Sequence, residues 1–320
     1  MFCIKNVCLE KNFNLNKLVI FGVGLIGGSV ALALKRTQFV THIVGVGRSQ
    51  KNLQDALNSS VIDSISDDLD VNIHAACSDA EIILIAAPVA QTANILRSIK
   101  PHLQLQTVIT DACSTKADVL TCAKEILGKQ FNQFVGGHPI AGAEKSGVSA
   151  AKADLFVGKN VVLTPYNRPD ISSDVPQTSI YAASAASNIA CVAKMWQACG
   201  ANVCEMSAEK HDAIFAAVSH LPHLLAFALV DEIASRPNAE ELFSFAASGF
   251  RDFTRIAGSS PEMWRDIALA NKTALLNEMS AFENELSQLK QLLKNDDGAG
   301  LQALFERASV ARNNWANDKK

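Results

Sequence analysis

The sequence has 320 residues, of which 48% are hydrophobic, and its formal net charge at pH 7 is -3. This length suggests two domains with buried cores, and the composition is that of an ordinary globular protein. The small negative charge argues against a nucleic acid or another polyanion as a partner. The eight cysteines include no C-x-x-C pair, which argues against a zinc or thiol-redox site and favours reduced thiols in the cytoplasm.

The sequence also argues against a signal peptide and a membrane span. The first 17 residues contain no apolar run long enough for the core of a signal peptide. The most apolar window, residues 214–230, contains two histidines and a proline and falls short of the roughly 20 apolar residues that a span needs. We therefore predict a buried core helix over this window and no membrane association.

Strand and helix patterns alternate along the first half of the chain. Residues 17–36 give a short apolar run, a glycine turn and then apolar residues at helical spacing, which predicts strand, turn and helix. Further strands are expected over 42–47, over the segment "AEIILIAAP" that ends at residue 88, at the start of "TVITDACSTK", and over "QFVGGHP". Helices are expected between them near 51–58 and 90–99. This order predicts an α/β fold with a Rossmann-type, doubly wound and mostly parallel sheet.

The pattern changes after the strand expected over residues 161–165. The following segment, "YNRPDISSDVP", is rich in Pro, Asp and Ser and predicts a linker, so we place the boundary between a dinucleotide-binding domain, 1–169, and a second domain, 170–320. Beyond it one short strand is expected at 201–204, and the rest is expected to be helical, with Ser207 as a helix cap.

A single long helix is expected over residues 261–294. Its apolar residues follow a heptad-like seam: Leu275, Met279, Phe282, Leu286, Leu289 and Leu293. Such a seam packs either on a neighbouring helix of the same chain or on a second subunit. We expect a helical domain that supports a homodimer.

The segment "GVGLIGG" predicts a dinucleotide site. It has the G-x-G-x-x-G pattern between an expected strand and helix, where glycines allow a tight turn and a close approach of a pyrophosphate to the helix N-terminus. The residues expected to contact the cofactor here are Gly22, Gly24, Leu25, Ile26, Gly27 and Pro88.

The end of the second strand predicts the choice of cofactor. NAD sites usually carry an acidic residue there, which binds the ribose 2′-hydroxyl. This chain has Gly47, Arg48 and Ser49 instead, so no carboxylate repels a 2′-phosphate and the guanidinium is available to it. We predict a preference for NADP over NAD.

Two segments that follow strands of the expected sheet carry candidate catalytic groups. They are "DACSTK", with Ser114, and "GGHPIAGAEKSG", with His138, and both belong at the edge of the sheet where ligands bind. Ser114 is expected to cap the following helix while still presenting its hydroxyl. His138 lies in a glycine-rich loop, which favours a role at the nicotinamide over a structural one.

The helical half carries two more candidate clusters. In "SHLPH", His220 and His223 are three residues apart, but no third ligand is evident, so we expect no metal site. Arg265 and Asp266 are expected to form a solvated or internal ion pair. Arg255 lies among apolar residues, and we expect it to be partly buried and to need a carboxylate partner, which a substrate would supply.

These motifs, in this order, resemble one family, the prephenate and arogenate dehydrogenases of tyrosine biosynthesis. The resemblance extends from "GVGLIGGS" through "DACSTK", "GGHPIAGAEKSGV" and "SHLPH" to "GFRDFTRIAGSSPEMWRDI". No chorismate mutase segment precedes the glycine loop, and the tail after residue 294 is short for a regulatory ACT domain, so we expect the monofunctional form. The resemblance implies a hydride transfer from a ring carbon that bears a hydroxyl to NADP or NAD, with loss of carbon dioxide.

The resemblance also implies roles for individual residues. His138 would accept the proton of the ring hydroxyl, and Ser114 would orient His138 or that hydroxyl. Arg255, from its own or the partner subunit, would bind a substrate carboxylate. The remaining residues implied at the substrate site are His220, His223, Ser219 and Glu144.

Two alternatives remain open. A β-hydroxyacid or imine-type dehydrogenase shares a glycine-rich start and a helical second domain, but it typically uses a catalytic Lys or Asp on a helix of that domain. A cofactor-binding sensor without catalysis is the second alternative, and the set of His138, Ser114 and Arg255 argues against it.

Overall fold

The computed structural model describes residues 2–3, 14–66, 70–142, 147–166 and 180–317. These residues form two compact units, Met1–Asn271 and Lys272–Lys320, and each unit is described by itself below. The expected domain boundary at 169/170 and most of the linker before residue 180 lie outside the described residues. That boundary therefore stays a prediction.

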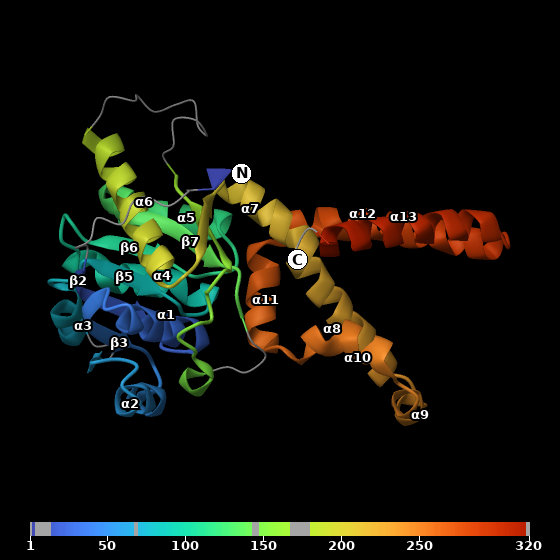
Figure 1. Cartoon of the computed structure of the whole chain (residues 1–320), viewed down its shortest axis with the longest axis horizontal. Coiled ribbons are helices and arrows are strands. Elements are labelled where there is room, and N and C mark those ends of the chain that lie inside the picture. The colour runs from blue at the N-terminus through green and yellow to red at the C-terminus, as the bar shows by residue number, and fades with distance from the viewer. Residues whose placement is uncertain (1, 4–13, 67–69, 143–146, 167–179, 318–320) are drawn as a thin grey trace. The chain divides into compact units, whose positions relative to one another are not determined.

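The first unit is built on a sheet of nine described strands in the order β1-β9-β8-β7-β6-β5-β2-β3-β4 (Figure 1). The six strands from β4 to β7 are all parallel, and their order, with the chain reversing direction across the sheet between β2 and β5, is that of a doubly wound dinucleotide fold. β8 joins β7 antiparallel, β9 joins β8 in parallel, and β1 closes the edge antiparallel. The predicted mostly parallel sheet is confirmed. The strands are β1 (Phe2–Cys3), β2 (Leu15–Phe21), β3 (Val40–Val46), β4 (Ser64–Ser66), β5 (Ile82–Ile85), β6 (Val108–Asp111), β7 (Phe134–Pro139), β8 (Asn160–Thr164) and β9 (Asn202–Glu205).

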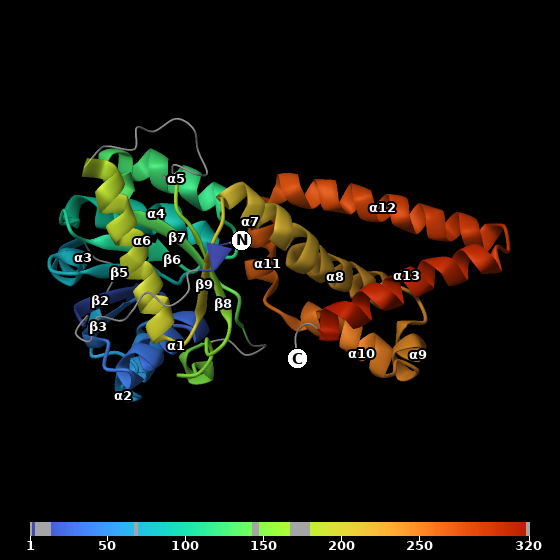
Figure 2. The same cartoon turned by 45° about the horizontal axis from the view of Figure 1, so that its top comes forward.

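Helices cover both faces of this sheet (Figures 1 and 2). In β2, Leu18 and Ile20 point into the core shared with α1 and α6, whereas Val19 and Phe21 point into the core shared with α3, α4 and α5. This alternation follows from the two-residue period of a strand, and both sets are apolar because both faces are buried. The helices are α1 (Leu25–Arg36), α2 (Gln50–Asn58), α3 (Asp70–Cys77), α4 (Thr92–Ile99), α5 (Ala117–Leu127) and α6 (Ile180–Ala198), with short turns η1 (Val89–Gln91), η2 (Lys100–His102), η3 (Gly128–Gln133) and η4 (Val148–Ala150).

The chain after β9 is helical within the first unit, as expected. Ser207 caps the first of these helices, because its hydroxyl accepts a hydrogen bond from the Lys210 N–H at 3.2 Å. A π-helical turn, η5, widens the path of the chain just before Pro222, whose ring cannot continue an ordinary hydrogen-bond ladder. The elements are α7 (Ala208–Phe215), η5 (Ala216–His220), α8 (Leu221–Ala234), α9 (Ala239–Ser244), α10 (Ser248–Thr254), η6 (Arg255–Gly258) and α11 (Pro261–Ala270).

The prediction of a buried core helix over residues 214–230 is wrong for the single chain. Ile214 and Val218 are 37% and 67% exposed, and within α8 only Leu221 and Ala226 are buried. Among the described residues, the helical stretch Ala208–Ala234 is long and apolar enough to cross a membrane by length and composition, with 28% of its most apolar window buried. Helices that pack against other protein also meet these criteria, so the predicted lack of membrane association stays a prediction.

The second unit consists of α12 (Lys272–Lys294) packed against α13 (Gly298–Asn317). The single helix expected over 261–294 is wrong, because Asn271 ends α11 with a non-helical backbone. The predicted seam of α12 is partly covered: Leu275 is buried, but Leu286 and Leu293 are 49% and 60% exposed. Both interpretations of this seam therefore remain open within the single chain.

Candidate active site

The glycine loop between β2 and α1 has the close packing that the motif predicts. Gly22 has φ of +94°, and a Cβ there would lie 2.7 Å from the Ala86 carbonyl oxygen. A Cβ on Gly27 would lie 2.2 Å from the Gly22 carbonyl oxygen, so this turn cannot accept side chains at either position. A Cβ on Gly24 would meet nothing within 4 Å. Gly24 therefore borders open space, as the glycine that faces a pyrophosphate should.

A cavity of about 790 Å³ opens beside this loop at the carboxyl ends of the strands. Its walls come from the loops after β2, β3 and β5, and they bring five of the predicted cofactor residues together: Gly22, Gly24, Arg48, Ser49 and Pro88. The other three, Leu25, Ile26 and Gly27, form the first turn of α1, whose N–H groups are available to an anion. The open space at Gly24, the helix N-terminus and the cavity fit a dinucleotide.

Two polar residues line this cavity where β3 ends. Arg48 is exposed at the end of β3. Ser49 caps α2 by accepting a hydrogen bond from the Asn52 N–H at 3.3 Å, and its own hydroxyl hydrogen remains available as a donor. Asn52, which sequence reasoning missed, donates to the Val23 carbonyl at 2.7 Å and so ties α2 to the glycine loop.

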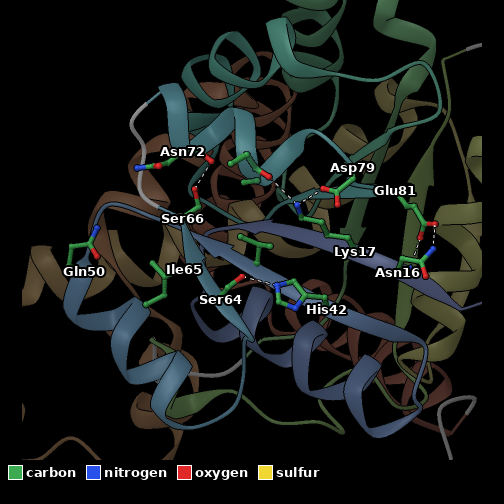
Figure 3. A pocket seen from close by; sticks show the side chains of 13 residues that line it. Asn16, Lys17, His42, Gln50, Ser64, Ile65, Ser66, Asn72, Asp79 and Glu81 are labelled. Carbon is green, nitrogen blue, oxygen red and sulfur yellow. Dashed lines mark hydrogen bonds and ion pairs between the residues drawn. The ribbon is translucent and has the colours of Figure 1, made fainter.

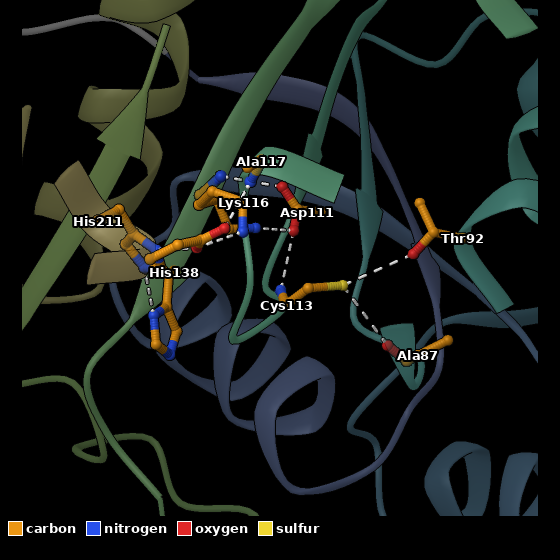
Figure 4. Close-up of polar contacts among 10 residues, drawn as sticks. Ala87, Thr92, Asp111, Cys113, Lys116, Ala117, His138 and His211 are labelled. Atoms are coloured by element: carbon orange, nitrogen blue, oxygen red, sulfur yellow. Dashed lines mark hydrogen bonds and ion pairs between the residues drawn. The ribbon is translucent and has the colours of Figure 1, made fainter. Parts of the chain in front are cut away.

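His138 lies near the end of β7, at the same edge of the sheet, and part of its surface is accessible. Its Nδ1 is 2.8 Å from Nε2 of His211 on α7 (Figure 4), and Nδ1 of His211 is 2.8 Å from the carboxylate of Asp212. Burial, with the nearby His211, Lys116 and His220, holds the pKa of His138 well below its ordinary value. His138 is therefore neutral and able to accept a proton at neutral pH.

A buried ion pair supports the loops around His138. Lys116 and Asp111 are both fully buried and in direct contact. Asp111 also accepts hydrogen bonds from the Cys113 N–H at 2.9 Å (Figure 4) and from the Gly137 N–H at 3.0 Å. One carboxylate thus fixes both the residue before His138 and the turn that carries the "DACSTK" segment.

The prediction that Ser114 caps the following helix is wrong. The N-cap of α5 is Lys116, and its side chain makes no capping bond. Asp212, distant in sequence, does the capping: its carboxylate oxygens accept hydrogen bonds from the N–H groups of Lys116 and Ala117, each at 2.9 Å. Ser114 lies partly accessible in the turn between β6 and α5. Its expected role toward the substrate stays a prediction.

The "SHLPH" segment places its two histidines in different surroundings. His220 is 1% exposed, and its Nδ1 lies 3.1 Å from the Asn271 side-chain nitrogen. The Nδ1–H of His223 donates to the Ser219 carbonyl at 2.8 Å, and its ring stacks on Trp264 with centroids 3.6 Å apart. Trp264 and Asn271 are two further residues of this region that sequence reasoning did not single out.

Among the charged residues of the helical part, Arg255 differs from expectation in its exposure. Arg255 is exposed rather than partly buried, because it begins the short turn η6 at the surface of the chain. It still lies close enough to His223 to contribute, after burial, to the lowered pKa of that histidine. Arg265 and Asp266 form the expected ion pair, at 2.6 Å. Glu144 lies outside the described residues.

The buried histidines predict a dependence of stability on pH. Burial lowers the pKa of His220 to about 4, with His211 and His223 adding to the shift and Asp212 opposing it. The unfolded chain binds this proton below about pH 6.5 while the folded chain does not, so the free energy of unfolding falls as the pH drops from about 6.5 to about 4. We expect His220 to account for about 3 kcal/mol of this loss. Urea titrations across this range should show a shallower pH dependence for His220→Gln than for the wild type, and an equal dependence would contradict the assignment.

A second cavity, of about 730 Å³, lies beside β4, the strand at one end of the sheet order (Figure 3). Its walls come from β2, β3, β4 and α3, with Gln50 at the start of α2. Its polar groups already pair with one another: Lys17 with Asp79, and Asn16 with Glu81 at 2.9 Å. It is therefore separate from the site around His138.

Comparison with known protein families gives two matches that together span most of the chain. Residues 30–205 match the model for the nucleotide-binding domain of prephenate dehydrogenase, and residues 207–307 match the model for its dimerization domain. The chain belongs to the prephenate dehydrogenase family. The predicted resemblance is therefore confirmed, as is the nucleotide-binding sheet followed by a helical domain.

Individual members of the family agree with this assignment. The chain is 36% identical over 297 residues to the prephenate dehydrogenase of Bacillus subtilis, covering 92% of this chain and 75% of that protein. It is 31% identical to the cyclohexadienyl dehydrogenase of Zymomonas mobilis, covering 92% and 94%. The crystal structure of prephenate dehydrogenase from Aquifex aeolicus, in complex with hydroxyphenyl propionate and NAD+, has a TM-score of 0.83 at 34% identity and covers 94% and 99% of the two chains.

Proposed function

We propose that this protein catalyses the NAD(P)-dependent oxidative decarboxylation of prephenate to 4-hydroxyphenylpyruvate, of arogenate to tyrosine, or of both. The observation that carries the proposal is its likeness, over 94% of the chain, to a prephenate dehydrogenase that binds hydroxyphenyl propionate and NAD+. An arogenate dehydrogenase from Synechocystis is similar over 93% of the chain, with a TM-score of 0.73. The proposal therefore includes both prephenate and arogenate as substrates.

The residues around His138 fit the chemistry of this reaction. A bound nicotinamide supplies the acceptor for the hydride of the ring carbon. The neutral imidazole of His138 takes the proton of the ring hydroxyl as the hydride leaves the ring carbon. The ring becomes aromatic when the bond to the carboxylate breaks and carbon dioxide leaves, because that electron pair passes through the ring to the oxygen, which regains a proton as the phenol hydroxyl. Ser114 orients the hydroxyl, and Arg255 binds a substrate carboxylate by its guanidinium. His220, His223, Ser219 and Glu144 complete the proposed substrate site.

The proposed enzyme acts as a homodimer in the cytoplasm. Its support is the dimerization-domain match over residues 207–307 and the apolar surface that the single chain leaves uncovered in that region. Large side chains exposed there include Val218 at 67%, Phe245 at 82% and Leu269 at 66%. Exposed apolar surface of this kind is typical of a subunit interface. Light scattering on the purified protein tests the dimer.

The proposed NADP preference rests on Arg48. Its exposed guanidinium at the mouth of the cofactor cavity is free of any nearby acidic residue at positions 47 and 49, so it can pair with a 2′-phosphate. We expect Arg48→Ala to lower kcat/KM with NADP by about tenfold, the effect of one charge-assisted hydrogen bond, and to change the value with NAD much less. Steady-state kinetics with both cofactors measure this. An equal loss with NADP and NAD would remove Arg48 from this role.

The choice of substrate is tested by the same kinetics with wild-type protein. Prephenate and arogenate are offered in parallel, each with NADP and with NAD, and the absorbance of the reduced nicotinamide is followed. The proposal expects turnover with at least one substrate and a higher kcat/KM with NADP. Folded dimer that binds the cofactor but turns over neither substrate would overturn it.

A further inference from the structure

His138 is the first of three side chains that are linked by hydrogen bonds and lead away from the proposed substrate site. His138 on β7 is hydrogen-bonded to His211 (Figure 4), which is hydrogen-bonded in turn to Asp212, and both of these residues lie on α7. Each of the two links is 2.8 Å long. His211 is completely buried and Asp212 is 5% exposed. The far end is anchored on the backbone, because the carboxylate of Asp212 also accepts the N–H groups that begin α5.

The donor and acceptor of each hydrogen bond in this row of side chains follow from the protonation state of Asp212, its anchored end. Burial by itself would raise the pKa of Asp212, but hydrogen bonds from His211 and from the N–H groups of Ala117 and Lys116 outweigh burial and lower it. Asp212 is therefore ionised and can only accept. Nδ1 of His211 must then carry a hydrogen and donate it to Asp212.

The same reasoning extends to His138. Burial lowers the pKa of His211, and Asp212 offsets only part of this effect, so His211 is neutral and its Nε2 has a lone pair. Across the 2.8 Å link, Nδ1 of His138 must donate to that lone pair. His138 is neutral too, so its Nε2 carries no hydrogen. This is the tautomer that a proton acceptor needs at Nε2.

We propose that His211 and Asp212 are positioning residues for His138, which hold it in the tautomer with an unprotonated Nε2 and stabilise the imidazolium that forms when it accepts the substrate proton. This inference rests on the proposed role of His138 in catalysis. When His138 Nε2 takes the hydroxyl proton, a positive charge appears on its ring, and the ionised Asp212 is the anion at the end of the hydrogen-bonded chain. Among the residues that the structure describes, the other charged or titratable groups that act on His138 are Lys116 from the "DACSTK" turn, which pairs with Asp111 of β6, and His220 of η5.

The geometry also fixes the position of the ring. The His138 ring contacts both His211 and Phe215 edge to face, with centroids 5.0 Å and 4.9 Å away. The Gly137 N–H is held by Asp111 on the other side. With its ring packed and its Nδ1 occupied, the remaining polar atom of His138 is Nε2, and the accessible part of the side chain is available to a substrate.

The variant Asp212→Asn, in the full-length dimer, tests this hydrogen-bonded relay from His138 through His211 to Asp212. Its amide has no negative charge and only one acceptor oxygen for the three N–H groups of His211, Lys116 and Ala117, so it weakens the anchor of His211 and removes the anion that stabilises an imidazolium at His138. We expect kcat to fall about 100-fold, with KM and the Kd of the cofactor within about threefold of wild type. The matched control is Asp63→Asn, because Asp63 also accepts a backbone N–H, from Ile43 at 2.8 Å, and pairs with a lysine, Lys35, but lies outside the relay. This control should keep wild-type kcat.

A spectroscopic measurement separates the relay from a merely structural role. Long-range ¹H–¹⁵N spectra of histidine-labelled protein distinguish the two tautomers, and His138→Asn assigns the His138 signals. We expect the Nδ1–H tautomer of His138 in wild type, and a loss of this preference in His211→Leu, which removes the acceptor for the Nδ1–H group. This readout does not depend on turnover. The spectra can therefore support the relay even if the protein turns over neither substrate, and turnover can support the proposed function even if the spectra contradict the relay.

A second pair of variants covers the case in which Asp212→Asn does not fold. His211→Gln keeps an amide oxygen able to accept from Nδ1 of His138, whereas His211→Leu has no acceptor. We expect Gln to retain a kcat at least about tenfold above that of Leu. The proposal is overturned by the Nε2–H tautomer of His138 in wild type, by a kcat of Asp212→Asn within about threefold of wild type, or by equal values for the Gln and Leu variants.

Discussion

Replacing His138 by Asn is expected to lower kcat by about 100-fold or more, because it removes the group that accepts the hydroxyl proton. The amide nitrogen of Asn can still donate toward His211, but its oxygen is far too weak a base for this step. The Kd of the cofactor should change little, since the walls of the cofactor cavity do not include His138. Steady-state kinetics and fluorescence titration with NADPH measure the two quantities.

The matched control for this variant is His42→Asn. His42 is also a partly buried histidine, hydrogen-bonded to Ser64 at 2.8 Å, but it lines the second cavity, beside β4 (Figure 3). Its replacement should leave kcat at the wild-type value. If His138→Asn turned over substrate as fast as His42→Asn, then His138 would not be the proton acceptor.

Replacing Lys116 by Met is expected to lower the free energy of unfolding by about 3–5 kcal/mol. The substitution leaves the fully buried carboxylate of Asp111 without its cation, and the two backbone N–H groups that it accepts compensate only part of the lost interaction. Because Asp111 holds the residue before His138, kcat should fall as well. Urea unfolding at fixed protein concentration measures the stability.

Two further variants test the cause of this loss. Lys35→Met breaks a lysine–aspartate pair of similar geometry, at 2.6 Å, whose side chains are 25% and 32% exposed, and it should cost less than about 1 kcal/mol. The double variant Asp111→Asn/Lys116→Met removes both buried charges and should be more stable than Lys116→Met alone. If the double variant were the less stable one, the buried charge of Asp111 would not be the cause of the loss.

The sequence was informative wherever a local pattern determines the structure. The turn at Gly22 and Gly27 follows from steric crowding that any side chain would meet, and the alternation of strands and helices follows from the periodicity of apolar residues. The position of His138 at the ligand edge followed from the direction of parallel strands. These features depend on neighbours in the chain, and they are the ones that sequence reasoning located.

The features that were missed depend on contacts between distant segments. His138 and His211 are 73 positions apart, and Asp212 caps a helix whose N–H at Ala117 is 95 positions away. The adjacent His and Asp of "EKHDAIF" were a visible signal, but no local rule pairs them with His138. The same distant carboxylate explains why Ser114 does not cap α5. α13 lies beyond the end of the long helix expected over 261–294, and none of its residues is buried in the single chain.

The break of the expected helix at Asn271 has a similar origin. Its side-chain nitrogen donates to the Asp212 carbonyl at 2.9 Å and also lies 3.1 Å from Nδ1 of His220. These contacts are formed by residues far away in sequence, so the periodicity of the helix does not reveal them. Most of α8 is likewise not buried within the single chain. A hydropathy pattern cannot distinguish such an apolar helix from one buried in a core.

In the proposed function, hydride transfer and loss of carbon dioxide are parts of one reaction at this site. The most direct test measures reduced nicotinamide and released carbon dioxide together, from the same reaction of the purified dimer with prephenate and with arogenate. The proposed function predicts that the two products form in equal amounts with at least one substrate, and that His138→Asn suppresses both. Reduced nicotinamide without carbon dioxide would contradict it, and would indicate a simple hydroxyacid dehydrogenase instead.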